Sequence, residues 1–256
     1  MKPPRFILDS EILKEKSVVL SKKELRHFKV LRLNYGDEII VSDGKGREFL
    51  ANVVKVDRQQ VALELLKEYS TPVDKLLNVV LYQGLTKGTK LELVIQKTTE
   101  LGVSKIVPMY SEYSQVKPKK DREHKLNRWQ EIARQAVRQS GRNYLPEITL
   151  YKSFKDSVLE AKQFDLAIIC CEPGHSAKSL KEVFKKSNNK TKRMGLEIKN
   201  LGIFIGPEGG FSSLEVAFAK QQGIIPVSLG ECALRSETAG IVSIGLALYL
   251  WGNLGN

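Results

Sequence analysis

The sequence predicts an α/β protein of two parts, a small N-terminal β-barrel and a larger parallel sheet with helices on both faces. Up to about residue 70, short runs of β-forming residues alternate with turn signals, which is typical of a small barrel. Further along, short apolar strands alternate with helical patterns, as in parallel α/β sheets. The predicted domains are 1–71 and 72–256, and a linker is expected over 69–74.

The first part is expected to hold four strands and one helix. Turns that contain glycine or aspartate separate the strands, which are Ser17–Leu20, Glu38–Val41, Glu48–Val56 and Gln60–Leu66. The helix is expected over Ser21–Val30. Ser21 and Glu24 have the spacing of a capping box, in which each side chain accepts a hydrogen bond from the other residue's backbone N–H.

In the second part, strands and helices are expected in alternation. A helix whose apolar positions recur from Leu91 is expected to end at Gly102. A polar, basic loop is expected over Ser187–Lys199. The expected strands are Leu76–Tyr82, Ser104–Pro108 and Asp165–Cys171. The other helices are expected over Lys125–Ser140 and from about Ala177 to Lys186.

The stretch from Gly206 to Glu215 is the first candidate binding element. It follows the apolar strand Leu201–Ile205, and Ser212 and Glu215 form a capping box that starts a helix ending before Gly223. A strand, a glycine turn and a helix N-terminus present free backbone N–H groups, and glycine lets a flat ligand approach the main chain. A plain tight turn fits the same pattern, which matches neither common nucleotide-binding fingerprint.

A second motif of the same kind covers Pro226–Ala239. It contains a short strand, a turn at Gly230, the pair Arg235 and Glu237, and the start of another helix. The apolar run Ala239–Trp251 is too short to span a bilayer, so we expect a core or interface helix.

The composition is strongly basic. The chain has 256 residues, with 41 Lys+Arg against 29 Asp+Glu and a formal charge of +12. The surplus is concentrated over 117–142 and 178–199, each with a local charge of +6. Such clusters favour a nucleic-acid partner, although a merely basic cytosolic protein remains an alternative.

The three cysteines give neither a disulfide framework nor a zinc spacing, so we expect reduced thiols and no metal. The first residues lack the apolar core of a signal peptide. Together these observations predict a cytoplasmic location and no membrane association.

Motifs along the whole chain resemble the RsmE family, bacterial small-subunit ribosomal RNA (uracil-N3)-methyltransferases of the SPOUT superfamily. The motifs that carry the resemblance are Arg5-Phe6, 27–33, Gly36-Asp37, 43–46, Lys87-Gly88, Gln96-Lys97, 99–103, 139–142, 206–211, Leu229-Gly230, 234–239 and 251–253. Two positions depart from the family pattern. Ser236 stands where the family often has Thr, and Arg26 where it often has a second His, which puts a role for paired histidines in doubt.

The resemblance implies a PUA-like RNA-binding barrel over 1–71 and a SPOUT methyltransferase domain over 72–256 with a C-terminal trefoil knot. It implies S-adenosylmethionine as methyl donor, and N3 of a uridine in 16S ribosomal RNA, free or in the 30S subunit, as acceptor. It also implies a homodimer with active sites at the subunit interface. The helix Thr238–Trp251 fits that interface, and a place in the monomer core would fit it equally.

By the resemblance, three loops at strand ends hold the cofactor: Cys171–Pro173, Gly206–Gly210 and Leu229–Ala239. Glu172 is a candidate for the ribose hydroxyls, and an exposed loop carboxylate is the alternative. The implied cofactor residues are Cys171, Glu172, Ile205, Gly206, Pro207, Glu208, Gly209, Gly210, Leu229, Gly230, Leu234, Arg235, Ser236, Thr238 and Ala239.

Arg235 and Glu237 are the candidate catalytic residues. Methylation at N3 requires loss of the N3 proton, and a guanidinium beside the uracil oxygens would stabilise the resulting negative charge. Glu237 could orient Arg235, accept a proton or cap the last helix. We favour orientation or capping, because a carboxylate paired with arginine is a weak base. His27, His124 and His175 are expected to face RNA or solvent.

Seven cations are expected to position the RNA, mostly through its phosphates. Arg134 and Arg138 share one helix face, and with the loop Lys117–Lys120 they are expected to form a basic stripe. The full set is Arg5, Lys29 and Arg32 in the barrel and Lys97, Arg134, Arg138 and Arg142 beyond it.

Two other functions remain open at this stage. One is a different SPOUT enzyme that methylates a ribose hydroxyl or another RNA base. The other is a non-catalytic RNA-binding or assembly protein that has kept the fold.

Overall fold

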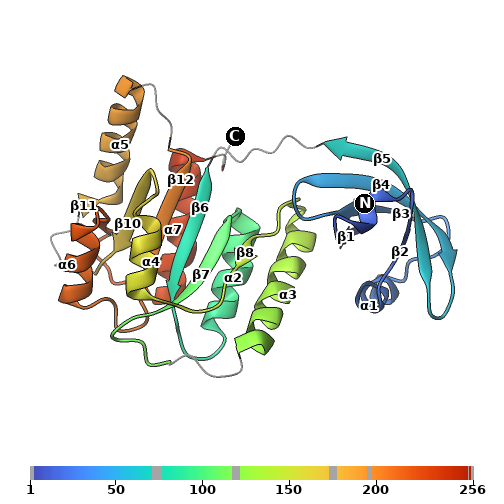
Figure 1. Ribbon diagram of the computed structural model, residues 1–256, viewed down its shortest axis with the longest axis horizontal. Helices are drawn as coiled ribbons and strands as arrows, with labels where there is room; N and C mark the ends of the chain where they lie inside the picture. The colour runs from blue at the N-terminus through green and yellow to red at the C-terminus, as the bar shows by residue number, and fades with distance from the viewer. Residues whose placement is uncertain are drawn as a thin grey trace. The chain divides into compact units, whose positions relative to one another are not determined.

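The computed structural model describes residues 3–70, 77–116, 122–172, 178–194, 198–252 and 254. The chain forms two compact units (Figure 1). The first contains the described residues before position 74 together with Arg134–Leu145, and the second contains the rest of the described chain. Of the sequence predictions, the linker residues 71–74, the loop Lys117–Lys120, and Pro173, His175 and Ala177 lie outside the described residues.

The first unit is built on a five-stranded sheet in the order β1-β3-β4-β5-β2. Strand β1 runs parallel to β3, and the other neighbours are antiparallel. The inward side chains form one core with α1, in which Phe6, Ile39 and Leu63 are fully buried. The elements are β1 (Arg5–Ile7), η1 (Ile12–Lys14), β2 (Ser17–Val19), α1 (Lys22–Val30), β3 (Glu38–Ser42), β4 (Arg47–Val56) and β5 (Val61–Ser70).

The predicted capping box is confirmed in one half, since the Ser21 side chain accepts a hydrogen bond from the Glu24 backbone N–H. The Glu24 carboxylate accepts from the Ser21 hydroxyl and not from the Ser21 backbone N–H. The four predicted strands are present, and β1 adds a fifth that is too short to show a pattern. Strand β5 continues through Tyr69 and Ser70, which the sequence assigned to the linker, because both residues pair with β4. In the described residues, β1 and β2 remain the two ends of the pairing order, so the pairing does not close a barrel.

The second unit is a parallel sheet in the order β11-β13-β10-β12-β6-β7-β8, with β9 also beside β7. Its strands are β6 (Asn78–Gly84), β7 (Lys105–Tyr110), β8 (Glu147–Ile148), β9 (Lys152–Ser153), β10 (Leu166–Cys170), β11 (Lys178–Ser179), β12 (Asn200–Ile205) and β13 (Ile225–Ser228). Its helices are α2 (Lys90–Leu101), α3 (Arg122–Ser140), α4 (Phe154–Ala161), α5 (Leu180–Met194), α6 (Ser213–Gln221) and α7 (Ser236–Trp251). Residues of α3 are divided between the two units.

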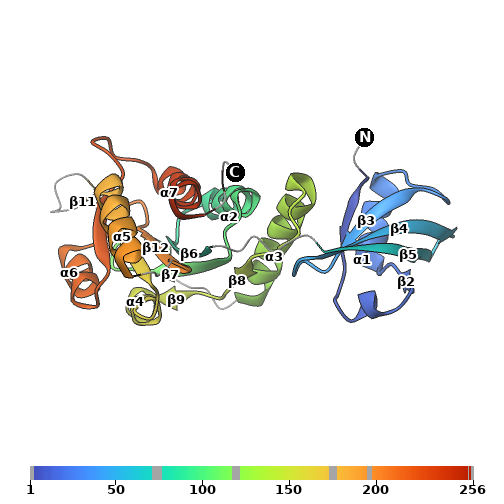
Figure 2. The ribbon, with the colours of Figure 1, turned by 90° about the horizontal axis from the view of Figure 1, so that it is seen from above.

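Helices cover both faces of this sheet, as the sequence predicted. Figure 2 shows α2 and α7 on one side and α4 and α6 on the other. On the α4 and α6 side, the rings of Tyr82 and Phe204 stack with centroids 4.3 Å apart, and Phe154 and Phe211 pack in the same core. The alternating strand and helix pattern was therefore a correct guide to this layered architecture.

The predicted basic loop over Ser187–Lys199 is wrong for its first part, because α5 continues to Met194. The polar composition suggested a loop, but the run from Leu180 to Met194 contains no glycine or proline to end a helix. The short elements β8, β9 and α4 were not predicted. Ser153 caps α4 by accepting a hydrogen bond from the Asp156 backbone N–H, a local signal that the sequence does carry.

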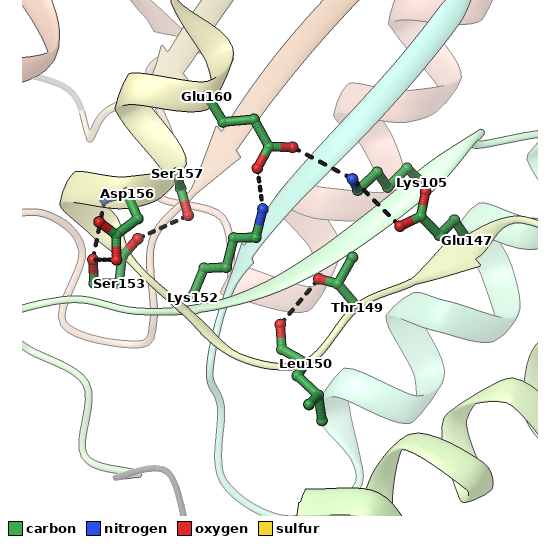
Figure 3. Close-up of polar contacts among 9 residues, drawn as sticks. All are labelled: Lys105, Glu147, Thr149, Leu150, Lys152, Ser153, Asp156, Ser157 and Glu160. Carbon is green, nitrogen blue, oxygen red and sulfur yellow. Dashed lines mark hydrogen bonds and ion pairs between the residues drawn. The ribbon is translucent and has the colours of Figure 1, made fainter.

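A cluster of charged side chains joins β7, β8, β9 and α4 (Figure 3). The Glu160 carboxylate accepts a hydrogen bond from Lys152 and lies 3.4 Å from Lys105 Nζ. Lys105 also lies 3.4 Å from a Glu147 oxygen. Burial raises the pKa of Glu160, but the hydrogen bond from Lys152 and the charge of Lys105 outweigh it, so the net pKa is below its usual value.

We predict that this cluster makes stability fall in acid. A carboxyl with a lowered pKa in the folded state stabilises the fold above its unfolded pKa, and the contribution disappears as pH falls through the folded value. In urea unfolding, Glu160→Gln is expected to lower the free energy of unfolding by roughly 1 kcal/mol at pH 7, and this difference should shrink as pH falls through the folded pKa of Glu160. Glu123→Gln, at an exposed position on α3, is the control and should have little effect. A pH-independent difference would contradict the prediction.

Candidate active site

Three loops of the second unit leave the same edge of the sheet. Strands β13, β10 and β12 are parallel neighbours, so their carboxyl ends lie side by side. The loops that follow them begin at Cys171, Gly206 and Leu229. In open parallel sheets this edge is where ligands bind. The structure therefore brings together the three loops that the sequence singled out.

A cavity of about 390 Å³ lies among these loops. This volume is within the range of about 300–1,000 Å³ that is common for small-molecule sites. The cavity is lined by Lys90, Cys170, Cys171, Glu172, Ile205, Gly206, Pro207, Glu208, Gly210, Leu229, Gly230, Cys232, Ala233, Leu234, Arg235, Ser236, Glu237 and Ala239.

Most of the predicted cofactor residues therefore line one cavity, with two exceptions. Gly209 lines an adjoining cavity of about 270 Å³ that shares Cys170, Cys171, Glu172 and Gly210 with the first. Thr238 is exposed in the first turn of α7 and lines neither cavity. The first cavity also contains Lys90, Cys170, Cys232 and Ala233, which the sequence analysis did not select.

The turn after β12 is compact because its glycines carry no side chain. The Gly210 N–H donates to the Pro207 carbonyl at 2.9 Å, and Gly210 has a φ of 69°. A Cβ on Gly206 would lie 2.9 Å from Gly210 main-chain carbons, and one on Gly84 would lie 2.3 Å from Pro207 N. The turn therefore folds back on itself and packs against the end of β6 only because glycine occupies positions 206 and 84.

Ser236 connects the start of α7 to two strands. Its hydroxyl donates to the Gly206 carbonyl at 2.5 Å and accepts from Gln83 Nε2 at 2.9 Å. Ser236 is buried, and Gln83 is fully buried. The hydroxyl predicted to contact a cofactor is therefore engaged in holding the glycine turn, β6 and α7 together.

Arg235 and Glu237 both line the cavity at the beginning of α7. Arg235 is the residue before the helix and is exposed, and Glu237 lies in the first turn. In the described part of the chain, no ion pair joins the two side chains, and the buried Glu237 Oε2 has no hydrogen-bond partner. The structure thus lacks both contacts that the sequence favoured, an ion pair in which Glu237 orients Arg235 and a capping hydrogen bond from a backbone N–H to the Glu237 carboxylate.

Glu208 links the glycine turn to the loop between β6 and α2. Its carboxylate accepts hydrogen bonds from Lys90 Nζ at 2.9 Å and from the Lys87 backbone N–H at 3.2 Å. Burial raises the pKa of Glu208, but these bonds and the charge of Lys90 outweigh it, so the net pKa is below the usual range. Lys90 had a usable signal, because it follows the motif Lys87-Gly88 at the start of a helix.

The walls of the cavity combine apolar and charged groups. Leu229 and Leu234 come from the loop after β13, and Glu172 stands exposed at the opening. Burial raises the pKa of Cys170 to about 12 and that of Cys171 to about 11. Both thiols therefore stay protonated and are poor nucleophiles near neutral pH. Within the described residues, no three His, Cys, Asp or Glu side chains group as metal ligands.

Six of the seven predicted RNA-binding cations belong to the first unit. Lys29 and Arg32 are exposed near the end of α1, and Arg32 has a φ of 54°, in the left-handed region. Arg134 and Arg142 are partly buried, and burial lowers the pKa of Arg142.

The described helices include none with the length and apolar content needed to cross a bilayer.

Three of the predicted cations are paired with carboxylates. Arg5 bonds Glu48, and Lys97 in the second unit lies 2.9 Å from Glu100. Arg138 Nη2 lies 3.6 Å from Glu24, and its side chain is only 10% exposed. Arg138 is therefore not part of an exposed basic stripe. It pairs with a buried carboxylate of α1 inside the first unit.

Two family profiles match this chain. The profile of an RNA methyltransferase domain covers residues 73–248, and that of an RNA methyltransferase PUA domain covers residues 20–66. Among curated proteins, the chain is 31% identical to ribosomal RNA small subunit methyltransferase E of Mesomycoplasma hyopneumoniae over 93% of this chain and 95% of the relative. It is 30% identical to the protein of that name from Bacillus subtilis, over 89% and 88% of the two chains.

Solved structures agree over nearly the full chain. A methyltransferase from Legionella pneumophila in complex with the cofactor SAM has a TM-score of 0.87 at 29% identity, with 99% of this chain and 100% of that chain covered. A ribosomal RNA small subunit methyltransferase E from Neisseria gonorrhoeae bound to S-adenosylmethionine has a TM-score of 0.84 at the same identity and coverage.

We predict that Ser236→Ala destabilises the second unit. The change removes the donor to Gly206 and leaves the buried Gln83 Nε2 only its long 3.5 Å contact with the Gly84 carbonyl, which costs roughly 1–3 kcal/mol. Thermal and urea unfolding should show a clear loss of stability for Ser236→Ala. Ser236→Thr is the matched control, since it keeps the hydroxyl and should be less destabilised. Equal stability of Ser236→Ala and the unmodified chain would contradict the bridging role.

Proposed function

The chain belongs to the RNA methyltransferase family that includes ribosomal RNA small subunit methyltransferase E, and from this premise we propose its reaction. It transfers a methyl group from S-adenosylmethionine to N3 of a uridine in the 16S RNA of the small ribosomal subunit. The observation that supports this most strongly is the cavity formed by the three loops at the edge of a sheet like that of its SAM-bound relatives.

The residues of the cavity fit S-adenosylmethionine. Gly206 and Gly210 line the cavity without a side chain, so a flat adenine can approach their main-chain groups. Leu229 and Leu234 provide apolar walls, and the exposed carboxylate of Glu172 can accept hydrogen bonds from ribose hydroxyls. When bound, the cofactor supplies a methyl group on a positively charged sulfur.

We assign Arg235 the role of contacting the uracil that receives the methyl group. N3 of uracil must lose its proton, and negative charge then spreads over N3 and the two carbonyl oxygens. A guanidinium held beside those oxygens stabilises this charge, typically by a few kcal/mol in a site that excludes water. Among the described residues Arg235 makes no ion pair, so its donors remain available to a substrate.

We assign Glu237 one of two roles, either to orient the Arg235 side chain or to accept the proton that N3 of uracil loses. Glu237 lines the same cavity, and its buried Oε2 has no hydrogen-bond partner in the described chain, so the carboxylate can turn to Arg235 or accept a proton once the RNA is present. A carboxylate that gains an arginine partner becomes a weaker base, which favours the orienting role.

The proposal includes a homodimer with α7 in the interface. Val242, Leu246 and Tyr249 of α7 are 37%, 38% and 68% exposed, and their spacing puts them on one side of the helix. An exposed apolar stripe on the helix that begins directly after Arg235 is consistent with a second subunit that completes the site. We also propose a trefoil knot within 72–256, a PUA-like RNA-binding domain over 1–71 and a cytoplasmic location.

The reaction can be tested on RNA that lacks the modification. Purified protein is incubated with labelled S-adenosylmethionine and either 16S RNA or 30S subunits, and the RNA is digested to nucleosides for mass spectrometry. We expect label in 3-methyluridine. A ribose-methylated nucleoside, or another methylated base, would reject the proposed acceptor, and no label with either substrate would reject the reaction.

We predict that Arg235→Ala abolishes turnover while the affinity for S-adenosylmethionine falls much less. The guanidinium acts on charge that develops on the base, so its removal should lower kcat by a factor of roughly 100–1,000. Calorimetric titration with the cofactor gives the affinity. Arg235→Lys keeps the charge without the planar donors and should be intermediate. Equal reductions of affinity and turnover would assign Arg235 to the cofactor or to the fold.

We predict that the double substitution Lys29→Gln and Arg32→Gln weakens RNA binding and leaves cofactor binding unchanged. Both side chains are exposed on the first unit, and removal of each cation from a phosphate should reduce the slope of log affinity against log salt by roughly 1. Filter binding across salt concentrations measures this slope. The substitution Lys155→Gln, at an exposed position on α4, serves as the control. An unchanged slope would contradict a role for this surface.

A further inference from the structure

A second cavity of the second unit shares the β6–α2 loop with the cofactor cavity. It has a volume of about 340 Å³ and is lined by the loop residues Leu85, Thr86, Gly88 and Thr89, by α2 and by the first half of α3. Lys90, at the end of the same loop, lines the cofactor cavity. The two cavities thus border one loop, and the reaction assigned above uses only one of them.

Aromatic rings form one wall of this second cavity. The rings of Trp129 and Tyr151 meet edge to face, with centroids 5.4 Å apart and an interplanar angle of 86°. Trp129 is buried and Tyr151 is half-buried. Lys125 Nζ lies 6.0 Å from the centre of the Tyr151 ring, so a cation stands beside the aromatic wall. Stacking rings next to a cation are the usual elements of sites for single-stranded nucleotides.

A buried hydroxyl also lines the cavity. Thr86 is 7% exposed, and its buried Oγ1 has no hydrogen-bond partner among the described residues. Burying a hydroxyl without a partner costs free energy, so such a group points to a ligand that supplies one. The base edges of nucleotides carry both donors and acceptors, and a hydroxyl can bond either.

The charged groups at the cavity favour a phosphate over a cation. Lys125, Arg128 and His124 line it, and the one acidic side chain among the described lining residues is Glu92. Glu92 is already paired with Arg128, whose Nε lies 2.7 Å from its carboxylate. The Glu92 carboxylate is thus neutralised, and Lys125 remains to contact the backbone of a bound strand.

We propose that this cavity binds a nucleotide of the substrate RNA that flanks the target uridine. Its base lies against Trp129 and Tyr151 and bonds Thr86 Oγ1, and its phosphate is held by Lys125. This inference rests on the proposed function, because the bound strand is that of the methylated RNA. Glu208 then connects the two sites, since it bonds Lys87 and Lys90 of the shared loop from the glycine turn of the cofactor cavity.

Trp129 allows a direct test of binding. The chain has two tryptophans, so Trp251→Phe leaves Trp129 as the only one. In this background, a short single-stranded RNA with the sequence around the modified uridine should quench the fluorescence in a saturable way. Thr86→Val, which removes only the hydroxyl, should weaken the affinity roughly three- to tenfold. An absence of quenching, or equal affinity for Thr86→Val, would overturn the proposal.

Measurements of turnover test the nucleotide site separately from the proposed methylation reaction. Thr86→Val and Lys125→Ala are expected to raise KM for RNA at least threefold, with the affinity for S-adenosylmethionine unchanged. Lys155→Ala on α4 is the matched control for Lys125→Ala and should leave KM unchanged. Normal 3-methyluridine formation with unaltered KM in both cavity variants would reject the nucleotide site alone. Absence of methylated product in the unmodified protein would instead reject the reaction.

Discussion

The hydroxyl of Ser236 holds the second unit's site together. It joins the Gly206 carbonyl to the Gln83 amide, and so it ties α7 to the ends of two neighbouring strands. The close approach of these segments also requires glycine at two positions. A Cβ on Gly240 would lie 2.5 Å from Gln83 Oε1, and one on Gly84 would meet Pro207. The position of Arg235, one residue before Ser236, is therefore fixed by packing beneath it, while its own side chain stays exposed.

Local signals were enough to predict much of this architecture. Ser21 with Glu24 and Ser212 with Glu215 mark helix starts within four residues, and both caps are present. The apolar strand Leu201–Ile205 could be predicted as well, but its place between β10 and β6 could not, because strand order depends on pairing between distant segments. The same limit hid the contact between Lys90 and Glu208, which are 118 residues apart.

The predicted set of seven RNA-binding cations overstates the positive charge that is open to a polyanion. Counting residues treats Arg5, Lys97 and Arg138 alike, yet each is paired with a glutamate. Arg138 and its partner Glu24 are both nearly buried, so their contribution is to the fold of the first unit and not to its surface field. Exposed cations such as Arg32 therefore carry more weight in attracting RNA than Arg138 does.

A methyltransferase that acts on one uridine must place that base against its cofactor and recognise where it lies in the strand. Phosphate contacts supply affinity but little discrimination, so recognition needs a pocket that touches bases. The loop over 85–90 borders both of the cavities that these tasks need. Thr86 lines the cavity proposed for the flanking nucleotide, and Lys90 lines the cofactor cavity. Since Glu208 fixes this loop to the glycine turn, a nucleotide seated beside Thr86 would be held in register with the cofactor by the same backbone. Positioning of this kind lowers the barrier to a direct displacement without any additional catalytic group.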